Sequence, residues 1–226
     1  ELLPMKKILT AASLLIASVS GSAAVTVPKY DIAKGKVIAE SVCGACHGVN
    51  GVSTVPAQPN LGGQNVKYLY KQLTEFKSGA RVNPIMSAQV AKLNDQDMAN
   101  VAGYFASQPR WGVGYANPAY AATAQKLYYG GNSTRGVIPC AGCHGGKANG
   151  NDLAAFPRIG GQHSAYIATQ LKLFRAAGRE DDVTDPSQMR MNDAAKKGDK
   201  GMMQIVASKL SDNDIKVLSD YISGLH

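Results

Sequence analysis

Two short segments of the chain carry the same arrangement of cysteine and histidine. They are Cys43-Gly-Ala-Cys46-His47 and Cys140-Ala-Gly-Cys143-His144, and together they use all four cysteines. Two thiols separated by two residues can form thioether bonds to the two vinyl groups of one porphyrin, and the histidine that follows lies under its iron. The motifs therefore predict two covalently bound c-type haems. The four cysteines are the predicted attachment points, and the two histidines are the predicted proximal iron ligands.

Two other uses of these motifs agree less well with the sequence. A redox-active C-x-x-C of the thioredoxin type needs a surrounding βαβ pattern, which the chain does not show. A zinc site would pair the two motifs, but it has no need of a histidine directly after each second cysteine. The haem interpretation is therefore favoured.

The chain offers a methionine as the second axial ligand of each iron. A haem that transfers electrons usually has two axial ligands, and methionine opposite histidine raises its potential. Met86 and Met203 are the candidates, since each lies seven residues before a leucine that precedes the last helix of its half. Met202, Met189 and Met191 compete for the second site, and the register of the repeat favours Met203. For methionine in general, core filling is the alternative role.

Ligation by two histidines is disfavoured by the composition. Only His163 and His226 remain after the motif histidines are assigned. His163 directly follows Gly-Gly-Gln at the start of a helix, where a solvated or capping role is ordinary. We therefore expect one histidine and one methionine at each iron.

The chain contains an internal repeat that includes both motifs. Leu61-Gly-Gly-Gln-Asn-Val-Lys-Tyr68 matches Ile159-Gly-Gly-Gln-His-Ser-Ala-Tyr166, and the segment from Lys92 to Asp97 matches the one from Lys209 to Asp214. Matching segments follow in the same order in both halves, which indicates a tandem duplication.

The repeat divides the chain into two domains of similar size. We expect a first domain over residues 25–112, a linker over 113–117 and a second domain over 118–226. The segment around this linker is rich in proline and glycine, which is typical of a domain boundary. Trp111 is expected to pack the two halves together.

Apolar periodicity predicts that both domains are helical. Residues recur at helical spacing in two sets: Val66, Leu69, Tyr70, Leu73 and Phe76, and Ile215, Leu218, Ile222 and Leu225. Asn94-x-x-Asp97 and Ser211-x-x-Asp214 predict capped helix starts. Each half is predicted to contain an amino-terminal helix that leads into C-x-x-C-H, a loop, a middle helix, a methionine-bearing loop and a final helix.

The amino terminus predicts export from the cytoplasm. Lys6 and Lys7 precede an uncharged stretch from Ile8 to Val27, and Ser22-Ala23-Ala24 offers small residues for cleavage. We expect a signal peptide over residues 1–24, of which residues 1–4 are extra upstream residues. Retention of this segment as a membrane anchor is the alternative. Both place the haem domains in the bacterial periplasm, soluble or tethered to the outer face of the cytoplasmic membrane.

The chain resembles the di-haem cytochrome c4 family in four features. These are the tandem motifs, the two Gly-Gly-Gln loops, the two methionines and the two Leu-[Ser/Asn]-Asp-x-Asp helix starts. The resemblance covers about residues 29–226. It implies an all-α fold of two class I cytochrome c domains related by a pseudo-twofold axis, with His/Met ligation at both irons. It further implies that the carbonyls of Pro59 and Pro157 accept hydrogen bonds from the proximal histidines.

The same resemblance implies a respiratory electron carrier that is not an enzyme. It would take single electrons from a quinol-oxidising complex or a dehydrogenase and pass them to a terminal oxidase. A bound cytochrome subunit of a membrane oxidase or dehydrogenase complex, or a di-haem redox enzyme, are the alternatives. The enzyme would need an open or unusually ligated iron, and no cysteine is left over to provide one.

The charge of the chain favours acidic redox partners. The net charge is +8, and loss of residues 1–24 with Glu1, Lys6 and Lys7 would leave +7. Such a charge favours acidic docking surfaces or an anionic membrane face, while the export signal argues against nucleic acid. A polar insertion over residues 179–200 lengthens the second half, and we expect a solvated excursion there, with a docking loop as the alternative.

Overall fold

The computed structural model describes residues 25–112, 114, 116–194 and 198–225. The predicted signal segment, residues 1–24, lies outside this range. Within it the chain forms helices and two isolated bridges, Asn132 with Val137 and Asn151 with Phe156, and no longer strand. The expected all-α fold is therefore confirmed. Among these described residues, no helix combines the length and the apolar character that crossing a membrane requires.

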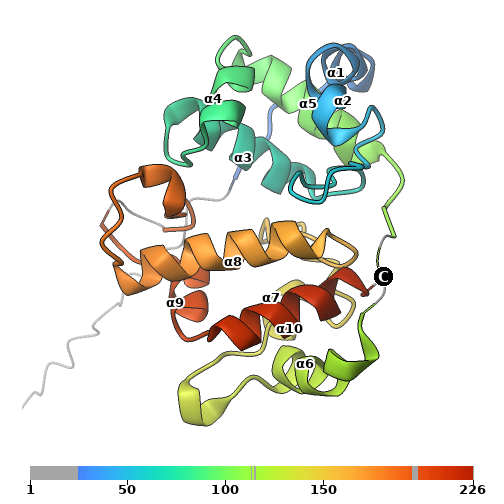
Figure 1. Cartoon of the computed structure of the whole chain (residues 1–226). Coiled ribbons are helices and arrows are strands. Elements are labelled where there is room, and N and C mark those ends of the chain that lie inside the picture. The colour runs from blue at the N-terminus through green and yellow to red at the C-terminus, as the bar shows by residue number, and fades with distance from the viewer. Residues whose placement is uncertain (1–24, 113, 115, 195–197, 226) are drawn as a thin grey trace, which may run out of the picture.

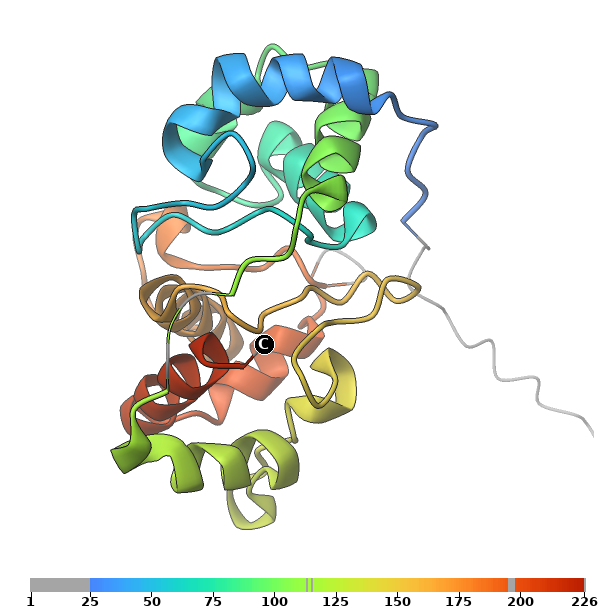
Figure 2. The same cartoon turned by 90° about the vertical axis from the view of Figure 1, so that its right-hand side faces the viewer.

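The helices form two groups that lie one above the other (Figures 1 and 2). The first group contains α1 (Ile32–Ile38), a π-helical turn (Ala39–Cys43), α2 (Gly44–His47), α3 (Val66–Ser78), α4 (Pro84–Val90) and α5 (Asp95–Ser107). The second contains α6 (Pro118–Gly130), α7 (Ala141–His144), α8 (Ser164–Arg179), α9 (Met202–Ser208) and α10 (Asp212–Ser223), with 3-10 turns at Ser133–Arg135 and Pro186–Gln188. Both groups follow the predicted order of elements.

Side-chain caps fix where the long helices begin. The Asn65 side chain accepts hydrogen bonds from the backbone N–H groups of Lys67 and Tyr68 at the start of α3. Asn94 and Ser211 each form a capping box with the aspartate three residues later, at the starts of α5 and α10. Such caps satisfy backbone donors that have no partner within the helix. The two capped starts predicted from the sequence are confirmed.

The methionine-bearing segments differ from the prediction, because both are short helices rather than loops. Met86 lies in α4, which begins at a capping Asn83 followed by Pro84, a residue suited to the first helical position. Met203 lies in α9, where its backbone N–H is bound by the side chain of Asp193. Both helices have only seven residues, so apolar periodicity gives them little signal.

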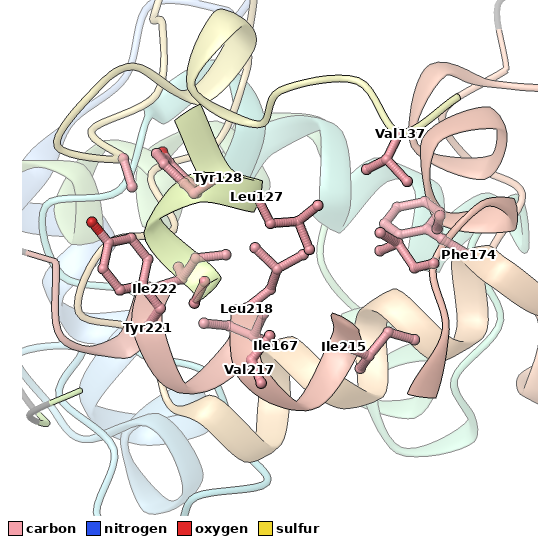
Figure 3. Packing of buried hydrophobic residues seen from close by; sticks show 14 residues of the cluster. Leu127, Tyr128, Val137, Ile167, Phe174, Ile215, Val217, Leu218, Tyr221 and Ile222 are labelled. Carbon is pink, nitrogen blue, oxygen red and sulfur yellow. The ribbon is translucent and has the colours of Figure 1, made fainter. Parts of the chain in front are cut away.

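Each group of helices encloses its own apolar core. In the second, Leu127 of α6, Ile167 of α8 and Leu218 of α10 point toward one another (Figure 3). Leu218 is 1% exposed, and burial of a side chain of this size contributes roughly 2 kcal/mol. A smaller core lies between α3, α5 and the π-helical turn and includes Leu69 and Phe105. The motif segments are thus held by two separate cores.

From the sequence we expected the insertion over residues 179–200 to be a solvated excursion. The structure shows instead that part of it is buried against the first domain. Arg190 and Asn192 are 6% and 7% exposed and contact α3 of the first domain. The backbone N–H of Arg190 also donates to the carbonyl oxygen of Leu173 in α8. These two polar side chains are buried because partners on both domains satisfy them, whereas most other polar side chains described in the segment are exposed. Trp111, which we expected to pack the two halves together, is 3% exposed, and its ring centre lies 5.1 Å from the guanidinium of Arg158 in the second domain.

Candidate haem sites and the interface between them

Both motifs fold into single helical turns that bury their histidine. Cys43 and Cys140 precede α2 and α7 and are half-buried, whereas the cysteines three positions later are exposed. Burial raises the pKa of both the Cys43 and the Cys140 thiols to about 11. His47 and His144 are each 7% exposed. None of the four cysteines forms a disulfide within the described residues, so all four sulfur atoms are available for attachment to a porphyrin.

A backbone carbonyl fixes the orientation of each motif histidine. His47 Nδ1 donates to the carbonyl oxygen of Pro59 at 2.9 Å, and His144 Nδ1 donates to that of Pro157 at 3.0 Å. Burial lowers the pKa of both imidazoles, which favours the neutral ring. A neutral ring that donates through Nδ1 keeps its lone pair on Nε2, the atom available to an iron. These contacts confirm what the resemblance implied for the two prolines and make both histidines suitable proximal ligands.

A tight loop brings each proline carbonyl back to its histidine. After the first motif, Gly51 adopts a φ of 76°, and a Cβ there would lie 2.3 Å from the backbone nitrogen of Gly62. The Gly51 carbonyl accepts hydrogen bonds from the backbone of Leu61 and Gly62. In the second domain Ala148 occupies the corresponding place, also with a positive φ of 53°, and accepts from Ile159. The loop is thus built in the same way twice.

The methionine candidates differ in their exposure. Met86 is half-buried on α4, and Met203 is half-buried on α9 against the core of the second domain. Met202 and Met191 are 55% and 54% exposed. A side chain that points into solvent cannot approach a haem held by the core. Exposure thus sets Met202 and Met191 apart from Met203, but Met189 is also half-buried, and Met203 stays a prediction from the repeat register.

Two buried donors, one in the loop after the first motif and one in the segment between the domains, suit a porphyrin with acidic side chains. Asn60 Nδ2 and Trp111 Nε1 are buried donors without a hydrogen-bond partner within the described part of the chain. Such donors are costly unless something accepts from them, and the propionates of haem carry acceptor oxygens. The same part of the chain contains no group of three His, Cys, Asp or Glu side chains that could hold a bare metal ion. The residues present therefore fit the predicted haem better than the zinc alternative.

Two glutamines, one from each Gly-Gly-Gln segment, link the domains. Gln64 Oε1 accepts from the backbone N–H of Arg158 at 2.8 Å, and its Nε2 donates to the carbonyl oxygen of Arg158 at 2.8 Å. Gln162 makes the same pair of bonds to Asn60, at 2.9 and 3.0 Å. All four residues are at most 5% exposed. We call these contacts the two glutamine clasps.

A second set of contacts joins α3 to α8 through two arginines. Arg81 and Arg190 lie 4.5 and 4.4 Å from the ring centres of Phe76 and Phe174. Each donates to the carboxamide oxygens of both Gln72 and Gln170, at 2.7 to 2.9 Å. Each also donates to a tyrosine of the other domain, Arg81 to Tyr166 and Arg190 to Tyr68.

Corresponding glutamines and tyrosines exchange roles in these contacts, and Arg81 and Arg190 do the same from positions that differ in the repeat register. This is the arrangement of a pseudo-twofold axis. Burial would raise the pKa of Tyr68, but the positive charges of Arg190 and Arg81 outweigh it and lower that pKa. His163, expected to be solvated or capping, places its Nε2 within hydrogen-bond distance of the carbonyl oxygen of Ser53 in the first domain, at 3.0 Å. The interface is polar and largely buried.

The sequence did not reveal these interface roles. The Gly-Gly-Gln segments were visible as a repeat, and a polar residue repeated beside glycines was the available signal. The sequence gave no signal for Arg190. Its counterpart in the first domain, Arg81, lies at a different place in the repeat register.

Comparisons with known proteins agree with this architecture. The cytochrome c family matches residues 32–109 and 122–226. Cytochrome c4 of Stutzerimonas stutzeri is 44% identical over 202 residues, which cover 85% of this chain and 87% of that protein. The crystal structure of reduced recombinant cytochrome c4 from Pseudomonas stutzeri matches with a TM-score of 0.77 at 43% identity, covering 88% of this chain and 100% of that one.

A more distant relative carries a different name. A thiosulfate dehydrogenase electron acceptor of Stutzerimonas stutzeri (strain A1501) is 30% identical over 191 residues, covering 83% of this chain and 80% of that protein.

Proposed function

The chain belongs to the cytochrome c family as a di-haem cytochrome of the c4 type, and we propose that it shuttles single electrons across the periplasm. In this proposal it accepts electrons from a quinol-oxidising complex or a dehydrogenase and delivers them to a terminal oxidase. The supporting observation is the duplication of a complete site: a C-x-x-C-H turn, a histidine held through Nδ1, and a half-buried methionine at the same register.

The residues of each site are arranged for electron transfer without exchange of ligands. When bound, haem iron stores one electron by cycling between the ferric and ferrous states. His47 and His144 present Nε2 on one side, and we propose that Met86 and Met203 supply sulfur on the other. The proline carbonyls keep each imidazole from rotating, so a change of oxidation state requires little rearrangement. With His47 and Met86, and His144 and Met203, as ligands, the two irons would have no open position for a substrate.

A dehydrogenase is supported as one donor by the relative named a thiosulfate dehydrogenase electron acceptor. The exported location is supported by the composition of residues 1–24, with two lysines before an apolar stretch. Fractionation of cells that produce the full chain tests the location. The proposal expects haem-stained protein in the periplasmic fraction, and its retention in the cytoplasm would contradict this.

The ligand assignment separates an electron carrier from an enzyme with an open iron. In the oxidised holoprotein, the sulfur-to-iron charge-transfer band should integrate to two methionine-ligated haems per chain. Cyanide should bind slowly to both irons of the oxidised protein, and carbon monoxide to both irons of the reduced protein, because a ligand must first dissociate. A band equivalent to one haem, together with rapid binding of cyanide, would instead identify an open site and support an enzyme.

A further inference from the structure

Each glutamine clasp ends on the peptide group that holds the proximal histidine of the other domain. The carbonyl of Pro59, which accepts from His47 Nδ1, and the N–H of Asn60, which donates to Gln162, belong to one planar peptide group. The second domain repeats this, because the carbonyl of Pro157 and the N–H of Arg158 form the peptide group between His144 and Gln64. A continuous hydrogen-bonded path thus runs from each histidine into the opposite domain.

The two hydrogen bonds of such a peptide strengthen one another. When the N–H donates to an acceptor, electron density shifts toward the carbonyl oxygen, which then accepts more strongly. Burial favours this effect, since Asn60 is 1% and Gln162 is 4% exposed and water does not compete. A stronger bond from Nδ1 makes an imidazole a more electron-donating ligand. The glutamine side chain would therefore act on the iron through the peptide group and the histidine rather than as an iron ligand.

We infer that Gln162 tunes the reduction potential of the haem in the first domain and that Gln64 tunes that of the haem in the second. Both are positioning residues that act across the interface. Each lowers the potential of the opposite haem, because a more electron-donating imidazole stabilises ferric iron. Docking of the domains thereby sets both potentials at once, and a change in the interface alters both. This inference rests on the proposed ligation by His47 and His144.

Crossed substitutions in the holoprotein test the inference. Gln162→Met keeps the length of the side chain but removes its acceptor and its donor. Its expected effect is a higher potential for the haem at Cys43 and Cys46 and an unchanged potential for the other. Gln64→Met should do the reverse. The two haems are distinguished in NMR spectra by contacts to their thioether bridges. In the reduced protein, the Nδ1 proton signal of His47 should move upfield in Gln162→Met alone.

A matched control separates tuning from general loosening of the interface. Gln170→Met removes the acceptor of Arg81 across the interface but touches neither peptide group. It should leave the difference between the two potentials unchanged. Gln162→Glu keeps an oxygen acceptor for the Asn60 N–H and should not raise the potential of the first haem. The inference is overturned if Gln162→Met shifts both haems equally, shifts only the haem of its own domain, or shifts neither.

The experiment also distinguishes failure of the inference from failure of the ligand assignment. If His47 were not a ligand, the His47→Ala holoprotein would keep its low-spin spectrum, whereas failed tuning leaves ligation intact and the potentials unmoved. If Gln162→Met does not fold, Gln162→Glu is tested instead, and the NMR signals of the histidine Nδ1 protons are measured. It must shift the His47 Nδ1 proton downfield and leave that of His144 in place, and an unmoved His47 signal overturns the inference.

Discussion

At the scale of single residues, the surroundings of the methionines bear on which sulfur we propose for the second haem site. Met202 and Met203 are neighbours on α9, but their side chains differ in surroundings. Met203 packs against the second core, whereas Met202 is 55% exposed. The repeat register predicted the same choice from the sequence alone. The helical setting was not predictable, because the cap of α9 comes from Asp193 in the insertion.

Single substitutions test this assignment. Met203→Ala should remove half of the sulfur-to-iron charge-transfer band of the oxidised protein and convert one haem to a high-spin or solvent-ligated form of lower potential. Met202→Ala should leave the band intact and serves as the matched control. An unchanged spectrum in Met203→Ala combined with a changed one in Met202→Ala would show that the register is wrong.

The ion pair of Asp214 with Arg135 predicts how acid affects the second domain. Hydrogen bonds from Arg135 and Ser211 lower the pKa of Asp214 from 3.8 to about 2. A carboxyl with a lower pKa in the folded state stabilises it above the unfolded pKa, and this contribution is lost as the pH falls through about 2. Asp214→Asn should lower the free energy of unfolding at pH 7 by about 1 kcal/mol, because solvent around the 40% exposed Arg135 side chain screens the ion pair.

Thermal unfolding of the holoprotein at several pH values measures this effect. Asp214→Asn should flatten the dependence of the midpoint on pH between about 4 and 2. Arg135→Gln should move the loss of stability to higher pH, because Asp214 then keeps a more ordinary pKa. A pH profile unchanged in both variants would contradict the assigned role.

At the scale of elements, the crossing of α1 and α5 depends on a glycine. A Cβ at Gly35 would lie 2.1 Å from the carbonyl oxygen of Asn100, which is backbone and cannot move aside freely. Gly35→Ala should therefore destabilise the first domain by about 3 kcal/mol. Gly130→Ala is the control, since no atom lies within 4 Å of its Cβ position.

Chemical denaturation, followed by absorbance of the haems, measures both variants. Gly35→Ala should unfold the first domain at lower denaturant, while Gly130→Ala leaves both transitions in place. Equal stability of the two variants would mean that α1 can shift on α5 at no cost.

Local signals explain which elements could be predicted from the sequence. The starts of α5 and α10 carry their own caps, and α3 has a long apolar face. The helices α4 and α9 are short, and the insertion is held by contacts with α3, which lies far away in the sequence. The predictable helices thus have a local cap or a long apolar face, whereas α4 has a local Asn83 cap but is too short for periodicity, and the insertion depends on distant partners.

At the scale of the whole molecule, the repeat predicted two domains but not how they face each other. The interface depends on polar groups such as Gln64, Gln162 and Arg190, whose partners are about a hundred residues away in the sequence. Hydrophobic patterns carry no information on such contacts. The two sites nevertheless follow the motifs closely, because both the histidine contact and the loop around it are local.

The net charge of +8 predicts how salt affects encounters with redox partners. Attraction to an acidic docking surface is screened at higher ionic strength, so the association rate falls. Stopped-flow oxidation by a small acidic redox protein should slow about tenfold or more between 10 and 300 mM salt. A rate independent of salt would show that charge does not guide docking.

The central claim is that the two domains form an internal electron relay. Pulse radiolysis of the oxidised full-length holoprotein, with less than one electron added per chain, tests it most directly. Reduction of one haem should be followed by redistribution to the other in a first-order phase whose rate does not depend on protein concentration. Redistribution at a rate proportional to protein concentration would show that electrons pass only between molecules, and this would contradict the relay.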